Sequence, residues 1–213
     1  MKKLCSICLM ILVLGMVSGC AVQYPDTNTI YIKKNGSVQE ASIESFDKSY
    51  YDEQGVKDYI ASEISNYEDS YAKGSVRMKD FLLEDGVAKL MMNYDNYQSY
   101  QNFNKRELFT GTVVQAIAAG YSFEGTFEAA DGRAAGAVSS TEGTENIGST
   151  VQTVDKSTVT GDENYKVVVV NEDTDVVVKG TILYISSGSV SVKSTDTASV
   201  KMLDEGVSYI VYK

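Results

Sequence analysis

The sequence contains no histidine, no tryptophan and a single proline, Pro25. Its three cysteines, Cys5, Cys8 and Cys20, all lie within the first 20 residues. The lack of histidine excludes Ser-His-Asp and Cys-His catalysis. Because no cysteine follows Cys20, the rest of the chain can hold neither a zinc site built on histidine or cysteine nor a disulfide. A secreted domain of this size could have used several disulfides.

Positive charge is also scarce, with 19 Lys and Arg residues against 29 Asp and Glu residues and a net charge of −10. Removal of residues 1–19 would remove Lys2 and Lys3 and take the net charge to −12. Nucleic-acid binding depends on neutralisation of phosphates by Lys and Arg, so we expect no nucleic-acid partner. Anionic lipid headgroups would be poor partners for the same reason, so a membrane anchor would have to be an acyl chain.

The amino terminus has the organisation of a secretory signal peptide. Two lysines follow Met1, residues 4–17 are largely apolar, and the small residues Ser18 and Gly19 precede Cys20. An uncleaved transmembrane helix is one alternative, but this run of 14 residues is shorter than the roughly 20 that span a bilayer. An ordinary secretory signal with a coincidental cysteine is another, and the lack of any later cysteine argues against it.

The stretch Val17-Ser18-Gly19-Cys20 resembles the lipobox of bacterial lipoproteins. The resemblance implies that the thiol of Cys20 receives a diacylglycerol and that the chain is cleaved just before it. Residues 1–19 would then be a signal peptide and residues 20–26 a lipidated tether. We therefore expect a protein on the outside of the cell membrane, with the membrane as its partner through the amino-terminal lipid.

Residues 27–128 carry the signals of an α+β domain. Asn35-Gly36 and Asp85-Gly86 are hairpin turn signals, because both positions of such turns need positive φ. Asp52 is a candidate N-cap for a helix with a single apolar stripe. The expected elements are strands at 29–34 and 37–45, a helix at 52–67, strands at 76–83 and 87–94, helices at 96–103 and 111–119, and a strand at 122–128. We interpret this as a ββ-α-ββ-α-β order, an antiparallel sheet with helices on one face.

The composition changes after residue 128. Residues 129–164 are rich in Ala, Gly, Ser, Thr and acidic residues, which predicts a flexible linker or long loop with at most a weak strand at 151–159. Residues 165–213 contain six short strand patterns separated by turns and predict a small all-β module. Continuous β-branched residues at 167–170 and 176–178 indicate strands that are buried on both faces. Whether these strands fold alone or join the first sheet is open.

Parts of the mature chain are similar to uncharacterised lipoproteins of Gram-positive bacteria. The similarity lies in the Asn35-Gly36 hairpin, the approach to the helix from Phe46 to Asp52, and the Ile-Val-Tyr-Lys ending. It implies no activity and no functional residue.

Tyr94, Tyr97 and Tyr100 recur every three residues among amide side chains and are the candidate ligand contacts. On one helix a step of three residues turns the side chain by about 60°, so at least one ring should be exposed and could contact a glycan or an envelope protein. The alternative is that the rings pack on the sheet, as tyrosine commonly does.

Acidic residues cluster in predicted turns, and Asp173 and Asp175 would be the best calcium ligands among them. The spacing fits no EF-hand, no phosphate-binding loop is present, and we expect no metal and no cofactor. The leading expectation is a binding or interaction module of unknown specific role on the cell surface. The alternatives are an envelope enzyme that hydrolyses glycans with carboxylates and a structural subunit of an envelope complex.

Overall fold

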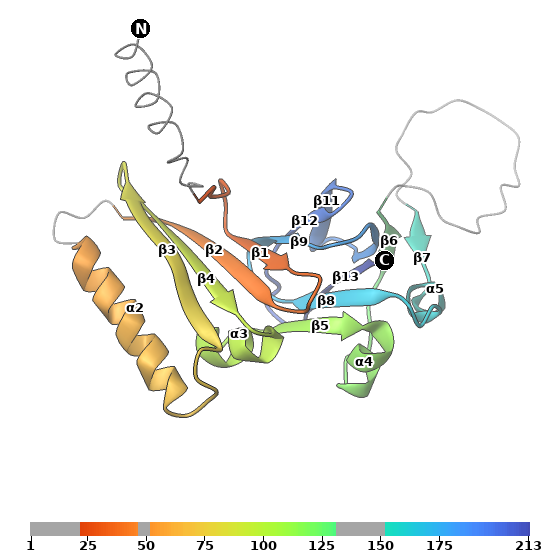
Figure 1. The fold of residues 1–213 in the computed structure, drawn as a ribbon. Coiled ribbons are helices and arrows are strands. Elements are labelled where there is room, and N and C mark those ends of the chain that lie inside the picture. Colours follow the sequence, from red (N-terminus) through yellow and green to blue (C-terminus); the bar gives the residue numbers. More distant parts are fainter. Residues whose placement is uncertain (1–21, 47–51, 131–151) are drawn as a thin grey trace, which may run out of the picture.

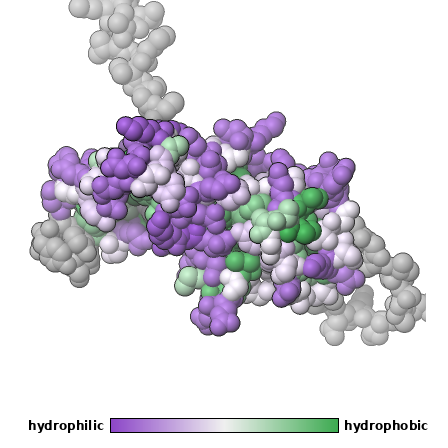
Figure 2. All heavy atoms as spheres, turned by 90° about the horizontal axis from the view of Figure 1, so that it is seen from below, coloured by the Kyte–Doolittle hydropathy of each residue, from purple (hydrophilic) through white to green (hydrophobic). Residues whose placement is uncertain are grey.

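The computed structural model describes residues 22–46, 52–130 and 152–213. Two sheets and a few short helices form an α+β fold, which confirms the expected class (Figure 1). Within these residues no helix is long and apolar enough to span a bilayer. Figure 2 shows that hydrophilic side chains cover most of one face of the molecule and that hydrophobic ones gather in smaller areas.

The larger sheet has seven strands in the order β11-β12-β9-β1-β2-β4-β3. All neighbours are antiparallel except β1 and β9, which are parallel. Its strands are β1 (Thr29–Ile32), β2 (Val38–Ser45), β3 (Val76–Glu84), β4 (Val87–Tyr94), β9 (Thr174–Val177), β11 (Val190–Ser194) and β12 (Thr197–Val200).

The smaller sheet has six antiparallel strands in the order β5-β8-β13-β10-β6-β7. Its strands are β5 (Leu108–Thr112), β6 (Phe127–Ala129), β7 (Thr153–Val154), β8 (Lys166–Val170), β10 (Ile182–Ser186) and β13 (Ser208–Tyr212). The described helices are α2 (Glu53–Glu68), α3 (Tyr97–Asn104), α4 (Val113–Ala118) and α5 (Lys156–Thr160). In this strand order the last strand of the chain, β13, lies inside the six-stranded sheet, between β8 and β10.

Strands from both halves of the chain share both sheets. β9 pairs with β1, β8 pairs with β5, and β10 pairs with β6. Residues 165–213 therefore do not form an all-β module of their own, and the two-unit division at 27–128 and 165–213 does not hold for these sheets. The physical reason is the β-branched run Val167–Val170, which is fully buried and requires cover on both faces and a partner on each edge.

The order ββ-α-ββ-α-β is not confirmed, because β5 separates α3 from α4 and belongs to the second sheet. Helix α4 begins after Thr112 rather than Thr110, since Thr112 and Gln115 form a reciprocal capping box. The expected strand at 122–128 is reduced to β6, because Phe123 has a φ of 52° and leaves the extended conformation.

The expected linker is only partly described. Residues 131–151 lie outside the described residues, so their predicted flexibility is not tested. The ends of the linker belong to the fold: Ala129 donates its N–H to the carbonyl of Gln152, and Val159 in α5 is fully buried. At most a weak strand was expected at 151–159; β7 is a strand of two residues within this range, and α5 follows it.

The core is built by alternation along the strands. Val168 and Val170 face the cluster shared with the seven-stranded sheet, whereas Val167 and Val169 face a second cluster with Phe123. The second cluster also contains residues of α4 and α5, so the six-stranded sheet is buried on both faces. The other face of the six-stranded sheet and the seven-stranded sheet together enclose the cluster that contains Val168 and Val170.

Local signals explain the elements that frame this core. Asp52 caps α2 by accepting a hydrogen bond from the N–H of Gly55 at 2.8 Å, as predicted. At the second hairpin Asp85 and Gly86 both have positive φ, as the two-residue turn requires. At the first hairpin only Gly36 does, and the loop closes through a hydrogen bond between Lys33 and Ser37.

Candidate functional site

The three tyrosines proposed as ligand contacts do not form an exposed platform. Tyr94 is the last residue of β4 and is 1% exposed, and Tyr100 in α3 is 0% exposed. Tyr97 is partly buried, with its ring 4.9 Å from that of Phe109. The expectation of an exposed ring among them is therefore wrong, because Asn96 caps α3 and separates Tyr94 from the helix on which the three-residue step was counted.

A pocket of about 360 Å³ lies beside the buried tyrosines, between β2, β4, α2, α3 and the turn that follows β8. Its volume falls within the range of small-molecule sites. Residues that line it include the polar set Glu40, Glu44, Glu63, Tyr94, Asn104, Arg106 and Glu172 and the apolar set Ile60, Leu90, Met92 and Phe103. Tyr94 is thus the one predicted contact residue that lines this cavity.

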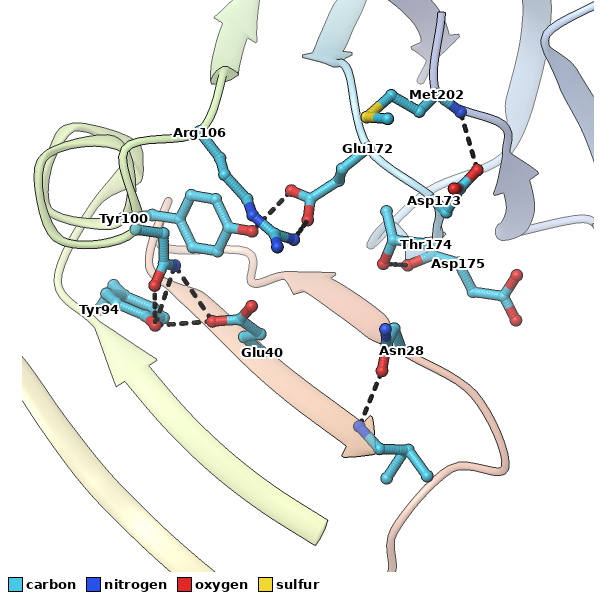
Figure 3. A network of polar contacts seen from close by, with 12 residues as sticks. Asn28, Glu40, Tyr94, Tyr100, Arg106, Glu172, Asp173, Thr174, Asp175 and Met202 are labelled. Carbon is cyan, nitrogen blue, oxygen red and sulfur yellow. Dashed lines mark hydrogen bonds and ion pairs between the residues drawn. The ribbon is translucent and has the colours of Figure 1, made fainter. Parts of the chain in front are cut away.

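Glu40 is held in the pocket wall by the register of the sheet. Val38 on β2 pairs with Tyr94 on β4, so Glu40 and Tyr94 are diagonal neighbours on one face. The hydroxyl of Tyr94 donates to Oε2 of Glu40 at 2.6 Å (Figure 3). Nδ2 of Asn104 donates to the same oxygen at 3.1 Å. Both donors therefore engage a single oxygen of the carboxylate.

Glu172 is the second carboxylate of the site and is 5% exposed. Leu108 on β5 pairs with Val170 on β8, and this register continued by two residues places Arg106 opposite Glu172. A guanidinium nitrogen of Arg106 lies 2.7 Å from Oε2, and the hydroxyl of Tyr100 donates to Oε1 at 2.6 Å (Figure 3). Both oxygens of Glu172 are therefore occupied.

The two carboxylate systems are in contact through the tyrosine rings. The centroids of Tyr94 and Tyr100 are 5.1 Å apart in an edge-on arrangement. Burial raises the pKa of both hydroxyls, and nearby Glu40 and Glu172 raise it further, so both tyrosines stay protonated and act as donors.

Burial also acts on Glu40. It raises the pKa of this carboxyl above its usual range, and the negative charge of Glu172 adds to the shift. The hydrogen bonds from Tyr94 and Asn104 and the charge of Arg106 act in the opposite direction. The net result is a carboxylate whose charged form is only partly stabilised by its surroundings.

The residues considered for calcium are already paired with protein groups. Oδ2 of Asp175 lies 2.6 Å from Nζ of Lys193 and accepts a hydrogen bond from Thr27, while Asp173 accepts one from the N–H of Met202. Across residues 22–46, 52–130 and 152–213, no three His, Cys, Asp or Glu side chains converge as metal ligands. These contacts give Asp173 and Asp175 a structural role in the β8–β9 turn.

The lipidation candidate Cys20 lies outside the described residues, and its role remains a prediction. Sequence reasoning missed Glu40, Asn104 and Arg106, and assigned Glu172 only to an acidic turn. One signal was available: the alternation along β2 places Glu40 on the same face as Val38, which is a buried position.

Comparisons with known proteins give no family to which the chain could be assigned. No protein-family model matches the chain, and neither a curated protein nor a solved structure shows significant similarity to it.

Proposed function

We propose that this chain is a bacterial lipoprotein, anchored through Cys20 to the outside of the cell membrane, that binds a small ligand in the pocket between β2, α2 and α3. The single observation that carries the binding function is the position of Glu40 in the wall of this pocket. The chain holds a partly desolvated carboxylate there with two dedicated donors, although its charge is costly to bury. Such a group at a cavity is typical of a functional site.

The amino-terminal lipobox supports the location. A protein with a net charge of −10 gains little attraction from an anionic membrane surface, so the acyl chains of Cys20 would supply the attachment. The folded part would then meet its ligand outside the membrane. The pocket replaces the tyrosine platform as the contact site, because Tyr94 and Tyr100 are buried.

A substitution that fills the pocket with a large side chain tests the binding function. Ser42 lines the pocket and Ser45, on the same strand, is exposed and does not line it. The full chain in nonionic detergent should give hits in a fragment screen by ligand-observed NMR. Ser42→Trp should remove these hits and Ser45→Trp should keep them. Hits that survive Ser42→Trp, or a complete lack of hits, would refute a ligand site here.

A second candidate function is carboxylate-based glycan hydrolysis. It is favoured by the pKa of Glu40, which is raised as a general acid requires, and by the presence of further carboxylates in the same pocket. Release of reducing sugar from cell-wall glycan by the purified chain, lost in Glu40→Gln, would support it. Binding of sugars without release of product would leave the chain a binding protein.

A further inference from the structure

Glu40 lines the pocket, and protein donors engage only one of its two carboxylate oxygens. Oε2 accepts both hydrogen bonds, from Tyr94 and Asn104, whereas Oε1 accepts none from the described residues. Every buried side-chain oxygen in the described part of the chain has a hydrogen-bond partner, so Oε1 cannot be a buried atom without one. Oε1 is therefore not fully buried, and Figure 3 shows it without a partner among the residues drawn. Because Glu40 lines the pocket, the pocket is the place where we expect a ligand to reach this oxygen.

The charges around the pocket are predominantly negative. Among the described residues, four carboxylates line it, those of Glu40, Glu44, Glu63 and Glu172, and Arg106 is the only cationic side chain that does so. The guanidinium of Arg106 is already paired with Glu172 at 2.7 Å. An anionic ligand would meet uncompensated repulsion here, whereas a cationic ligand would be attracted.

A metal ion does not fit this site. Calcium requires six to eight oxygen ligands and magnesium a near-octahedral set, and the described residues contain no converging group of three acidic, His or Cys side chains. Part of the wall is apolar, with Ile60, Leu90, Met92 and Phe103 among the lining residues. A hydrated ion would leave this apolar surface unused, whereas an alkyl or aryl group would bury it.

We infer that the ligand is an organic cation in which a primary ammonium group pairs with Oε1 of Glu40 and an apolar chain lies against Leu90, Met92 and Phe103. This inference rests on the proposed function, because it names the ligand class of the same pocket. The fixed geometry of Glu40, set by Tyr94 and Asn104, gives an ammonium donor a preorganised acceptor. A neutral hydroxyl could donate to the same oxygen but would gain no ion pair.

The test compares two probes that share one alkyl chain and differ in the headgroup, a charged ammonium in one and a neutral hydroxyl in the other. n-Butylammonium and 1-butanol are titrated into the full chain in nonionic detergent, with NMR chemical shifts or calorimetry as the readout. We expect n-butylammonium to bind at least about tenfold more tightly, a difference of about 1.4 kcal/mol. Glu40→Gln keeps an acceptor for Tyr94 and Asn104 and should abolish this preference. Glu84→Gln removes the same charge from an exposed residue of β3 and should preserve it.

The wild-type comparison needs no variant, so the inference can be refuted even if Glu40→Gln does not fold. Equal binding of the two probes, or an ammonium preference that survives in folded Glu40→Gln, would overturn the ligand class and leave the pocket as a site for another ligand. Failure of both probes, together with fragment hits that Ser42→Trp removes, would overturn the ligand class alone. Failure of both probes and of the fragment screen would overturn the proposed function as well.

Discussion

The hydroxyl of Tyr100 donates a hydrogen bond of 2.6 Å to Oε1 of Glu172, a residue 72 positions further along the chain. This bond ties α3 to the turn between β8 and β9 and satisfies a carboxylate that is almost fully buried. Tyr100 is thus a structural donor, although the sequence suggested a ligand contact.

Removal of that donor should destabilise the fold. Tyr100→Phe leaves one oxygen of a buried carboxylate without its partner, which costs about 1–3 kcal/mol. For a chain of this size the melting temperature should fall by roughly 2–4 °C per kcal/mol. Tyr97→Phe is the control, because the Tyr97 hydroxyl makes no hydrogen bond to the described residues, and it should melt close to the wild type. Equal melting of both variants would contradict a structural role for Tyr100.

The ion pair between Arg106 and Glu172 can be tested by a double-mutant cycle. The Arg106 side chain is 56% exposed and that of Glu172 is 6% exposed, so water solvates the charge of Arg106 but hardly that of Glu172. Arg106→Met should cost about 1–3 kcal/mol, since it leaves one oxygen of the buried carboxylate without its hydrogen-bond partner. The double variant Arg106→Met/Glu172→Gln should recover part of this loss in the free energy of unfolding, measured by chemical denaturation. Purely additive effects would show that the two side chains do not interact.

Glu40 should reduce stability at neutral pH. Its pKa is raised in the folded state, so its contribution to stability is greatest below the unfolded pKa, about pH 4, and is lost as the pH rises through the folded pKa. Glu40→Gln should therefore raise the melting temperature at pH 7 by a few degrees, and the gain should shrink towards pH 4. Glu84→Gln, at an exposed ion pair, should change it little at either pH. A Glu40→Gln variant that melts lower than the wild type at pH 7 would oppose this account.

Membrane attachment should depend on Cys20. Cys20→Ser should release the protein or leave an unprocessed precursor, as fractionation and mass spectrometry of the amino terminus would show. Cys8→Ser lies before the predicted cleavage point and should leave processing intact. A Cys20→Ser protein that stayed in the membrane and was cut at the same place would refute the lipoprotein assignment.

The shared sheets predict how a nicked chain behaves. If a specific protease site is inserted within residues 131–151 and cleaved, the two fragments should remain together on size-exclusion chromatography without denaturant. The reason is that β1–β9, β5–β8 and β6–β10 pairs cross the cut. Separation of the fragments under native conditions would restore the two-domain interpretation.

Local signals were sufficient for several elements, although not for β5 or α5, and they did not identify which strands pair. The cap at Asp52 and the turn at Asp85-Gly86 depend on neighbouring residues, and both are as predicted. The burial of β8 on both faces was also predictable from its run of valines. The parallel pairing of β1 with β9 joins distant segments, and no local pattern in either strand specifies it.

The pocket was missed for the same reason. Glu40 lies on β2 and Glu172 follows β8, and they line one cavity only because the sheets bring these strands together. The misassignment of the tyrosines had a different cause. The strand end at residue 94 and the helix start near residue 96 were predicted, but the helical step of three residues was still counted from Tyr94, which lies in β4. Such a step relates the directions of side chains only within one helix.

The internal position of β13 constrains the order of folding. The strands that flank it, β8 and β10, can complete their ladders only when Ser208–Tyr212 are present, and the parallel β1–β9 pair likewise waits for the second half of the chain. Contacts this distant in sequence slow folding, and a chain interrupted during synthesis or export would expose open strand edges. The export that we propose for this chain would accommodate this delay, because the native sheets of a chain exported unfolded are assembled only after the whole chain has emerged.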